Sequence, residues 1–175
     1  YGLKADHVES REGMMPGLYA IDTDADGERS FSYWRSASAA RTLFTAPCDV
    51  GLEKLNDFDL VFLSGITMAI LPPDIRSDVL AWADRYRAAG GTLAYDSNHR
   101  PHLWESAAIA RHVNSAMWAR ADIALPSIDD EMSLFGDPDE AAVVARLAAI
   151  GAQNGALKRG AMGPLNLSDG RVLTD

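Results

Sequence analysis

Four short polar segments each follow an apolar run, and they contain residue types that bind anions, phosphates and metal ions. They are SGIT at 64–67, DSNHR at 96–100, PSIDDE at 126–131 and KRGAMG at 158–163. In an open parallel sheet, ligands bind beyond the carboxyl ends of the strands. Because each segment stands where a buried strand is expected to end, we expect the four segments to form one site.

Each segment also has a simpler interpretation. The DSNHR turn offers a carboxylate, an amide and a guanidinium, but such groups also serve as loop caps and surface charges. The acidic run 129–131 could hold Mg²⁺ through waters. A helix N-terminus with Ser127 as its N-cap is the favoured interpretation of that run. Gly160 and Gly163 would let the backbone approach a phosphate, yet a plain turn needs the same residues.

A fifth candidate is the stretch GERSFSYWR at 27–35. Alternation along a strand places Phe31, Tyr33 and Arg35 on one face, and Ser32 and Trp34 on the other. An aromatic ring, a phenol and a planar guanidinium on one face are suited to a polar anion. The alternative is an edge strand whose arginine is simply solvated.

The remaining pattern predicts an α/β fold with a mostly parallel sheet flanked by helices. Short apolar strands are expected at 60–63, 92–95, 122–125 and 155–158, and the first should be buried on both faces. Helices are expected between Pro72 and Gly90 and at 104–119, 128–135 and 138–151. A closing antiparallel pair is expected at 164–173, turned at Asp169-Gly170. The hairpin at 17–35 lies outside this alternation, and we expect it to form a small separate sheet, as a lid over the main one.

Two helices carry apolar stripes at helical spacing. Ile75, Val79, Trp82 and Tyr86 form the first stripe, and Ile109, Val113 and Met117 form the second. Stripes with this period are typical of helices that pack on a core, so we expect both sets to point inward.

Composition limits the functional classes. The chain has 175 residues, 47% of them hydrophobic, and a net charge of −9, which argues against nucleic-acid binding but allows a small anionic substrate. No apolar run approaches the ~20 residues of a membrane span, and a single Cys48 fits a reducing compartment, so we expect a cytoplasmic protein. The chain begins at Tyr1 without a Met and stops at Asp175 within what reads as a domain, so we expect it to be part of a longer protein.

Taken together, these segments resemble the ribokinase-like (PfkB) carbohydrate kinases, and within that family the 2-keto-3-deoxygluconate kinases. The resemblance rests on PGLYAIDTDADGERSFSYWRSASAA (16–40), LSGIT (63–67), DSNHRPHLW (96–104), LPSIDDE (125–131) and LKRGAMGPL (157–165). It covers essentially the whole chain, residues 1–175, as a partial kinase domain in which both the sheet and the lid are incomplete. It implies ATP-dependent phosphorylation of 2-keto-3-deoxygluconate at its C6 hydroxyl, in sugar-acid catabolism of the Entner–Doudoroff type, with Mg²⁺.

The resemblance also implies roles for individual residues. Substrate-binding positions would be Tyr19, Tyr33, Arg35, Ile66 and Arg100. Nucleotide-binding positions would be Asn98, Ser127, Lys158, Gly160 and Gly163, and Asp130 would act indirectly on the metal. Trp34 is expected to pack against protein, and the lid is expected to join copies of the chain into a homo-oligomer.

The chain also departs from the family pattern. The Gly-Ala-Gly-Asp motif that supplies an anion hole and an aspartate base is absent, and Asp175 lacks that context, so no catalytic residue is assigned within the chain. Two alternatives therefore remain. One is a related kinase for another sugar, such as fructose, or for a nucleoside, and the other is a non-catalytic homologue that only binds sugar acids.

Overall fold

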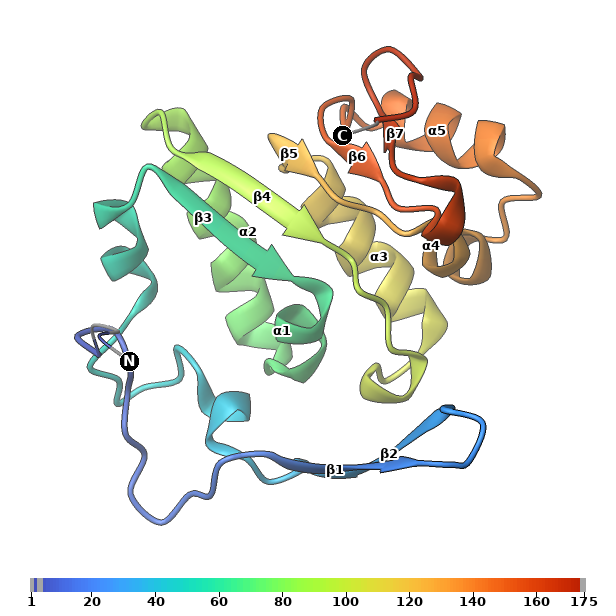
Figure 1. Ribbon diagram of the computed structural model, residues 1–175. Coiled ribbons are helices and arrows are strands. Elements are labelled where there is room, and N and C mark those ends of the chain that lie inside the picture. The colour runs from blue at the N-terminus through green and yellow to red at the C-terminus, as the bar shows by residue number, and fades with distance from the viewer. Residues whose placement is uncertain (1, 3–4, 174–175) are drawn as a thin grey trace.

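The main sheet is parallel and has three strands in the order β3-β4-β5. A computed structural model describes residues 2 and 5–173 and places β3 at Leu60–Ser64, β4 at Thr92–Asp96 and β5 at Ile123–Ala124. Leu60 pairs with Thr92, and Ala94 pairs with Ile123. Figure 1 shows helices α2 (Pro73–Ala88) and α3 (Ala107–Trp118) behind this sheet. The predicted α/β architecture is confirmed.

The first crossover brings two loops of the predicted site together. Helix α1 (Gly65–Ile70) follows β3 directly, and the Ser64 hydroxyl accepts a hydrogen bond from the Ile66 amide at 3.2 Å. A Cβ atom on Gly65 would lie 1.9 Å from the Ser97 carbonyl oxygen. Only glycine therefore allows the start of α1 to pack against the segment after β4.

Helix α2 agrees with its sequence signals. It begins at Pro73, and the chain turns away at Gly90, which has a φ of 96°. The stripe Ile75, Val79, Trp82 and Tyr86 is buried, as predicted. No helix in the described part of the chain is both long and apolar enough to cross a membrane.

Helix α3 differs from its predicted register. It begins at Ala107 after the Ser106 N-cap, while Pro101–Leu103 form a separate 3-10 turn, η3. Val113 and Met117 are buried, but Ile109 is 37% exposed, and its predicted inward position is wrong. Ala110 and Asn114 complete the buried face instead, because the Asn114 amide oxygen accepts a hydrogen bond from the Tyr95 hydroxyl at 2.7 Å.

The two faces of β3 have different surroundings. Val61 and Leu63 are buried towards the helices, whereas Leu60 is 50% and Phe62 is 53% exposed. Among the residues that the structure describes, no helix covers the face that carries Phe62, which is turned towards the viewer in Figure 1. The expectation that this strand is buried on both faces is therefore wrong for the described chain.

The C-terminal third extends the sheet through short strands. Helices α4 (Ile128–Phe135) and α5 (Glu140–Ala149) precede β6 (Ala156–Leu157), which pairs antiparallel with β7 (Leu165–Asn166). The Lys158 amide donates to the Pro126 carbonyl at 2.7 Å, so the segment around β6 also runs parallel to the one around β5. A bridge between Leu165 and Val172 closes the predicted antiparallel turn.

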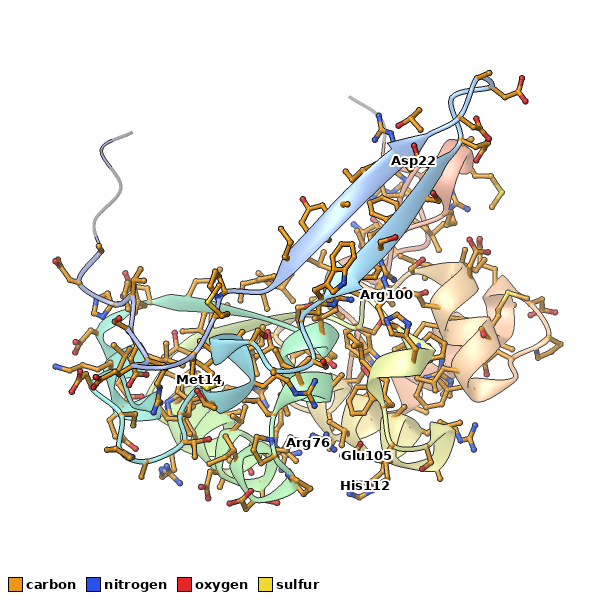
Figure 2. The ribbon with its side chains drawn as sticks, turned by 90° about the horizontal axis from the view of Figure 1, so that it is seen from below. Met14, Asp22, Arg76, Arg100, Glu105 and His112 are labelled. Carbon is orange, nitrogen blue, oxygen red and sulfur yellow. The ribbon has the colours of Figure 1, made fainter. Side chains whose placement is uncertain are left out.

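The predicted hairpin is present as a separate two-stranded sheet. Strands β1 (Leu18–Thr23) and β2 (Arg29–Trp34) pair with Tyr19 opposite Tyr33 and Ile21 opposite Phe31. In Figure 1 the hairpin lies below α1 and η3, on the side where β3 and β4 end. Figure 2 shows it extending away from the body, with Asp22 towards its outer end. Trp34 is 60% exposed, so within the described residues it does not pack against protein as expected.

Two further 3-10 turns, η1 (Ala39–Thr42) and η2 (Leu52–Asp57), connect the hairpin to the sheet.

A buried arginine, Arg76 of α2, holds the end of α1 and the segment before α3. Arg76 donates from Nε to the Met68 carbonyl at 2.7 Å and from Nη2 to the Ala69 carbonyl at 3.2 Å, which caps the end of α1. Its Nη2 also lies 2.7 Å from Glu105 Oε1, and Figure 2 shows the pair together. The Arg76 hydrogen bond lowers the pKa of Glu105.

A buried acid links helices α4 and α5 next to the DSNHR loop. Glu131 of α4 is 0% exposed, and its Oε2 accepts from Arg146 of α5 at 2.9 Å. Burial raises the pKa of the Glu131 carboxyl, and Arg146 offsets only part of that shift. Ser97 and Trp118 of α3 also favour the charged form, although neither has direct hydrogen-bonding geometry to Glu131 Oε1. Glu131 thus joins α4 to α5 next to the DSNHR loop.

The raised pKa of Glu131 predicts a direction for the pH dependence of stability. Below the ordinary pKa of 4.5 this carboxyl is protonated in both the folded and the unfolded state, and its ionisation costs nothing. As pH rises from there through the raised folded pKa, ionisation costs more in the folded state, so the protein loses stability. We expect Glu131→Gln in the full-length protein to remove this loss, measured as the free energy of unfolding in denaturant at pH 4–8.

Glu105→Gln is the control of opposite sign. The folded pKa of Glu105 is lowered, so its contribution is present above its ordinary pKa of 4.5 and is lost as pH falls through the folded value. Relative to wild type, the two variants should therefore show stability differences that change with pH in opposite directions. Parallel pH profiles for both variants would contradict this account of Glu131.

Candidate functional site

A cavity of about 550 Å³ lies between the base of the hairpin, η1, α1 and η3, and we call it the hairpin cavity. Four of the five predicted substrate residues line it: Tyr19, Tyr33, Arg35 and Ile66. The other lining residues are Gly17, Leu18, Ser36, Ser38, Ala40, Arg41, Ile70, His102 and Leu103. Its volume falls within the range of ~300–1,000 Å³ that is usual for small-molecule sites.

Stacked rings connect the hairpin to the main body at this cavity. The Tyr33 ring stacks on Phe31 with centroids 6.1 Å apart, and on His102 of η3 with centroids 6.3 Å apart. The guanidinium carbon of Arg35 lies 4.1 Å from the centroid of the Tyr33 ring. The predicted shared face of Phe31, Tyr33 and Arg35 is thus confirmed, and it faces the body rather than solvent alone.

The charge of the cavity is opposite to that of the chain. The whole chain carries 25 acidic residues, yet the described lining contains no Asp or Glu and does contain Arg35, Arg41 and His102. Neither arginine side chain makes an ion pair with any described residue. Unpaired guanidinium groups around a cavity favour a ligand with a carboxylate or phosphate.

Arg100, the fifth predicted substrate residue, is placed differently. Its side chain is exposed, and its Nη1 donates to the carbonyl of the neighbouring His99 at 2.8 Å. It is not among the residues that line the hairpin cavity; its position on the loop after β4 is marked in Figure 2.

The predicted nucleotide-binding residues gather where β4, β5 and β6 end. Lys158 Nζ lies 2.6 Å from Asp96 Oδ2, and the Asn98 amide donates to Asp96 Oδ1 at 2.9 Å. Asn98 has a φ of 33°, a left-handed conformation in which asparagine is one of the more tolerated residues. Asp96 therefore joins Lys158 and Asn98; the sequence placed it in a site segment but gave it no individual role.

Asp130 and Ser127 lie at the start of α4. Asp130 Oδ2 accepts a hydrogen bond from the His99 amide at 3.0 Å, so this carboxylate holds the DSNHR loop. Ser127 occupies the N-cap position, but its side chain makes no capping hydrogen bond. No group of three or more His, Cys, Asp or Glu residues that could hold a metal occurs in the described chain. One oxygen of the Asp130 carboxylate already accepts a hydrogen bond, so this side chain is better suited to contact a metal ion through a water than to coordinate it directly.

The glycine segment leaves its backbone open on one side. Gly160 and Gly163 have φ values of 57° and 74°, and nothing lies within 4 Å of a Cβ built on Gly160. Arg159 steadies the turn by donating from Nε to the Gly163 carbonyl at 2.8 Å. An open backbone with this geometry is able to approach a phosphate closely.

Sequence reasoning missed two basic residues of the hairpin cavity, Arg41 and His102. Each is close along the chain to a residue that was chosen: Arg41 lies six positions after Arg35, and His102 two positions after Arg100. Basic residue type near a predicted anion site was the available signal. Asp175, which was left without a role, lies outside the described residues.

Comparison with known proteins places this geometry in a family. The model of the pfkB family of carbohydrate kinases matches residues 1–173. A 2-dehydro-3-deoxygluconokinase of Dickeya dadantii is 39% identical over 175 residues, which cover 99% of this chain and 56% of that protein. The protein of the same name from Escherichia coli K12 is 39% identical over 96% of this chain and 55% of its own length. The chain thus spans about half the length of the curated relatives it matches.

Two more distant proteins complete the comparison. Fructokinase-2 of Solanum habrochaites is 29% identical over 70% of this chain and 36% of its own length. The crystal structure of a PfkB protein from Polaromonas sp. JS666 superposes with a TM-score of 0.72 and 25% identity, covering 86% of this chain and 50% of that one. The chain belongs to the pfkB family of carbohydrate kinases.

Proposed function

We propose that the full-length protein transfers the γ-phosphoryl group of ATP to the C6 hydroxyl of 2-keto-3-deoxygluconate, with Mg²⁺. The observation that carries the proposal is the hairpin cavity, with its unpaired arginines and no acidic residue in its described lining. A neutral sugar does not require such a cavity, whereas a sugar acid does. The names of the two relatives at 39% identity support the same substrate.

The hairpin residues would bind the sugar acid from the hairpin side of the cavity. Arg35 would hold the carboxylate through parallel N–H donors, and its contact with the Tyr33 ring limits its orientation. Tyr19 and Tyr33 would supply hydroxyl groups, and Ile66 an apolar wall. Arg100 would reach the substrate or the transferred group by leaving the His99 carbonyl, which it contacts in this structure.

The second cluster would serve the nucleotide. Carbohydrate kinases of this family use ATP. We assign Lys158, Asn98, Gly163 and the open backbone at Gly160 to the border of the ATP site, with the hydroxyl of Ser127 near the phosphates. Asp130 would hold a water of the Mg²⁺ ion, and the ion would neutralise charge on the phosphates. Lys158 would exchange its contact with Asp96 for a phosphate oxygen, which is a direct competition between two anions.

Catalysis in this account is mainly positioning and charge stabilisation. An aspartate of the full-length protein that is not among residues 1–175 would orient the C6 hydroxyl. The cavity and the Lys158–Asp96 pair lie on the same side of the sheet, beyond the ends of β3, β4 and β6, so acceptor and donor would meet there.

The hairpin also supports a proposal about assembly. The face opposite Tyr33 carries Trp34, which is 60% exposed. Exposed apolar groups on an unpaired two-stranded sheet favour association with another chain. We therefore propose a homo-oligomer formed through the lid, in the cytoplasm, where the single Cys48 stays reduced.

The substrate is tested with the full-length protein in an assay that couples ADP release to a colour change. We expect turnover with 2-keto-3-deoxygluconate and much lower kcat/KM with fructose, ribose or a nucleoside. Equal or better turnover of a neutral sugar would overturn the sugar acid in favour of a related kinase. Tight binding of the sugar acid by calorimetry without any ADP release would favour the non-catalytic homologue.

The two predicted arginines are expected to act differently. Arg35→Ala should chiefly weaken sugar-acid binding, by about 1.5–3 kcal/mol if a hydrogen bond to a charged group is lost. Arg100→Ala should also lower kcat, if this group senses charge on the transferred phosphoryl. Arg29→Ala is the matched control, because Arg29 lies on the same strand face at the turn end, outside the cavity lining. Unchanged kinetics in both test variants would exclude contact with substrate.

The assembly proposal predicts the behaviour of one variant. Trp34→Asp places a charge on the exposed outer face of the hairpin, and we expect it to shift the full-length protein to a smaller species in sedimentation velocity. Asp22→Asn, on the same face near the hairpin's outer end, should leave the oligomer intact. An unchanged sedimentation coefficient for Trp34→Asp, or a monomeric wild type, would rule out assembly through this face.

A further inference from the structure

Arg41 lines the hairpin cavity without a role in the function proposed above. It lies on η1, beyond the hairpin, and its side chain is half-buried. Within the described chain its guanidinium makes no hydrogen bond and no ion pair, unlike the buried Arg76, which has four partner atoms. A half-buried cation that lines a cavity without a partner has lost part of its hydration, and an anion in the cavity would compensate for that loss.

Nearby acids do not satisfy Arg41. Glu105 is close enough for Arg41 to lower its pKa slightly, but both Glu105 oxygens accept from Arg76, at 2.7 and 3.1 Å. The described cavity lining offers hydroxyl groups and apolar side chains, and no carboxylate. Two guanidinium groups, of Arg35 and Arg41, therefore border one cavity, and an anion there would offset the charge of both.

The support of Arg41 differs from that of Arg35. Arg35 follows an exposed strand that has one partner strand only. In contrast, η1 is held on both sides: the Ala39 amide donates to the Met15 carbonyl at 2.9 Å, and Arg11 Nη2 donates to the Thr42 carbonyl at 3.0 Å. Arg41 is thus carried by a turn that is hydrogen-bonded to the segment before the hairpin and to Arg11.

We propose that Arg41 is a specificity-determining residue that binds the substrate carboxylate together with Arg35, from the fixed side of the hairpin cavity. The inference rests on the proposed function, because it assumes an anionic sugar in this cavity. The two guanidinium groups approach the same anion from different elements, one on the lid and one on the body. Arg41 then discriminates an acid from a neutral sugar, because only the acid offers its guanidinium a charged partner.

The test compares two substrates that differ only at the proposed contact. One is 2-keto-3-deoxygluconate, and the other is 3-deoxyfructose, in which a CH₂OH group replaces the carboxylate. For Arg41→Gln in the full-length protein, we expect KM for the acid to rise about tenfold or more, with kcat nearly unchanged. KM for 3-deoxyfructose should stay within about twofold of wild type, because the neutral sugar offers Arg41 no charge. Arg41→Lys should recover part of the affinity for the acid.

Arg85→Gln serves as the matched control, because Arg85 lies on α2 outside the hairpin cavity and its side chain is 63% exposed. Thermal melting followed by circular dichroism confirms that each variant is folded. An equal rise in KM for both substrates would show that Arg41 only supports the cavity, and an unchanged KM for the acid would show no contact. Both results overturn the inference while the proposed function stands. If wild type does not phosphorylate the acid at all, the proposed function fails first, and the inference fails with it.

Discussion

In a chain of net charge −9, the guanidinium groups of Arg35 and Arg41 border the hairpin cavity without meeting a carboxylate of the described residues. This local excess of positive charge is the constraint on which the functional account depends. Coulomb attraction between opposite charges is strongest where water is partly excluded, so an acidic chain would be expected to neutralise such a cavity. The acids near the site do not neutralise the cavity, because Glu105, Glu131 and Asp96 pair with other basic residues.

Ion pairs elsewhere in the fold hold the elements around the site. Arg76 holds Glu105 and the end of α1, Arg146 holds the buried Glu131, and Lys158 holds Asp96. These contacts position the loops after β3, β4 and β5. Glu131 is costly as a buried charge, yet it joins α4 to α5 next to the DSNHR loop. Arginine side chains therefore occur in two settings: Arg76 and Arg146 pair with carboxylates, and Arg35 and Arg41 border the hairpin cavity without an ion pair to a described residue.

Much of the fold was predictable from the sequence, because strand alternation, proline and glycine positions and helical stripes are local signals. The hairpin, α2, β4 and the segments around α4 and β6 follow them. Ile109 was misplaced because the hydroxyl–amide contact between Tyr95 and Asn114 rotates α3 towards a polar residue, which a hydrophobic stripe does not reveal. The half-exposure of Phe62 likewise depends on which elements pack over the sheet, and a local apolar run does not predict those elements.

The candidate site shows the same division. Tyr19, Tyr33, Arg35 and Ile66 were predicted to share a site, and the structure brings them onto one cavity, where their roles remain predictions. Arg41 and His102 were missed because their convergence depends on how η1 and η3 pack against α1, a tertiary arrangement without a local motif. Arg100 was predicted from its sequence motif, but its side chain donates to the His99 carbonyl and does not line the cavity.

The central claim is that the carboxylate of a sugar acid binds beneath the hairpin, and the most direct measurement is a crystal structure of the full-length protein with 2-keto-3-deoxygluconate. The account predicts the sugar in the hairpin cavity, with its carboxylate in hydrogen-bonding contact with the guanidinium of Arg35. A carboxylate bound away from the cavity, with the guanidinium of Arg35 left in solvent, would contradict it.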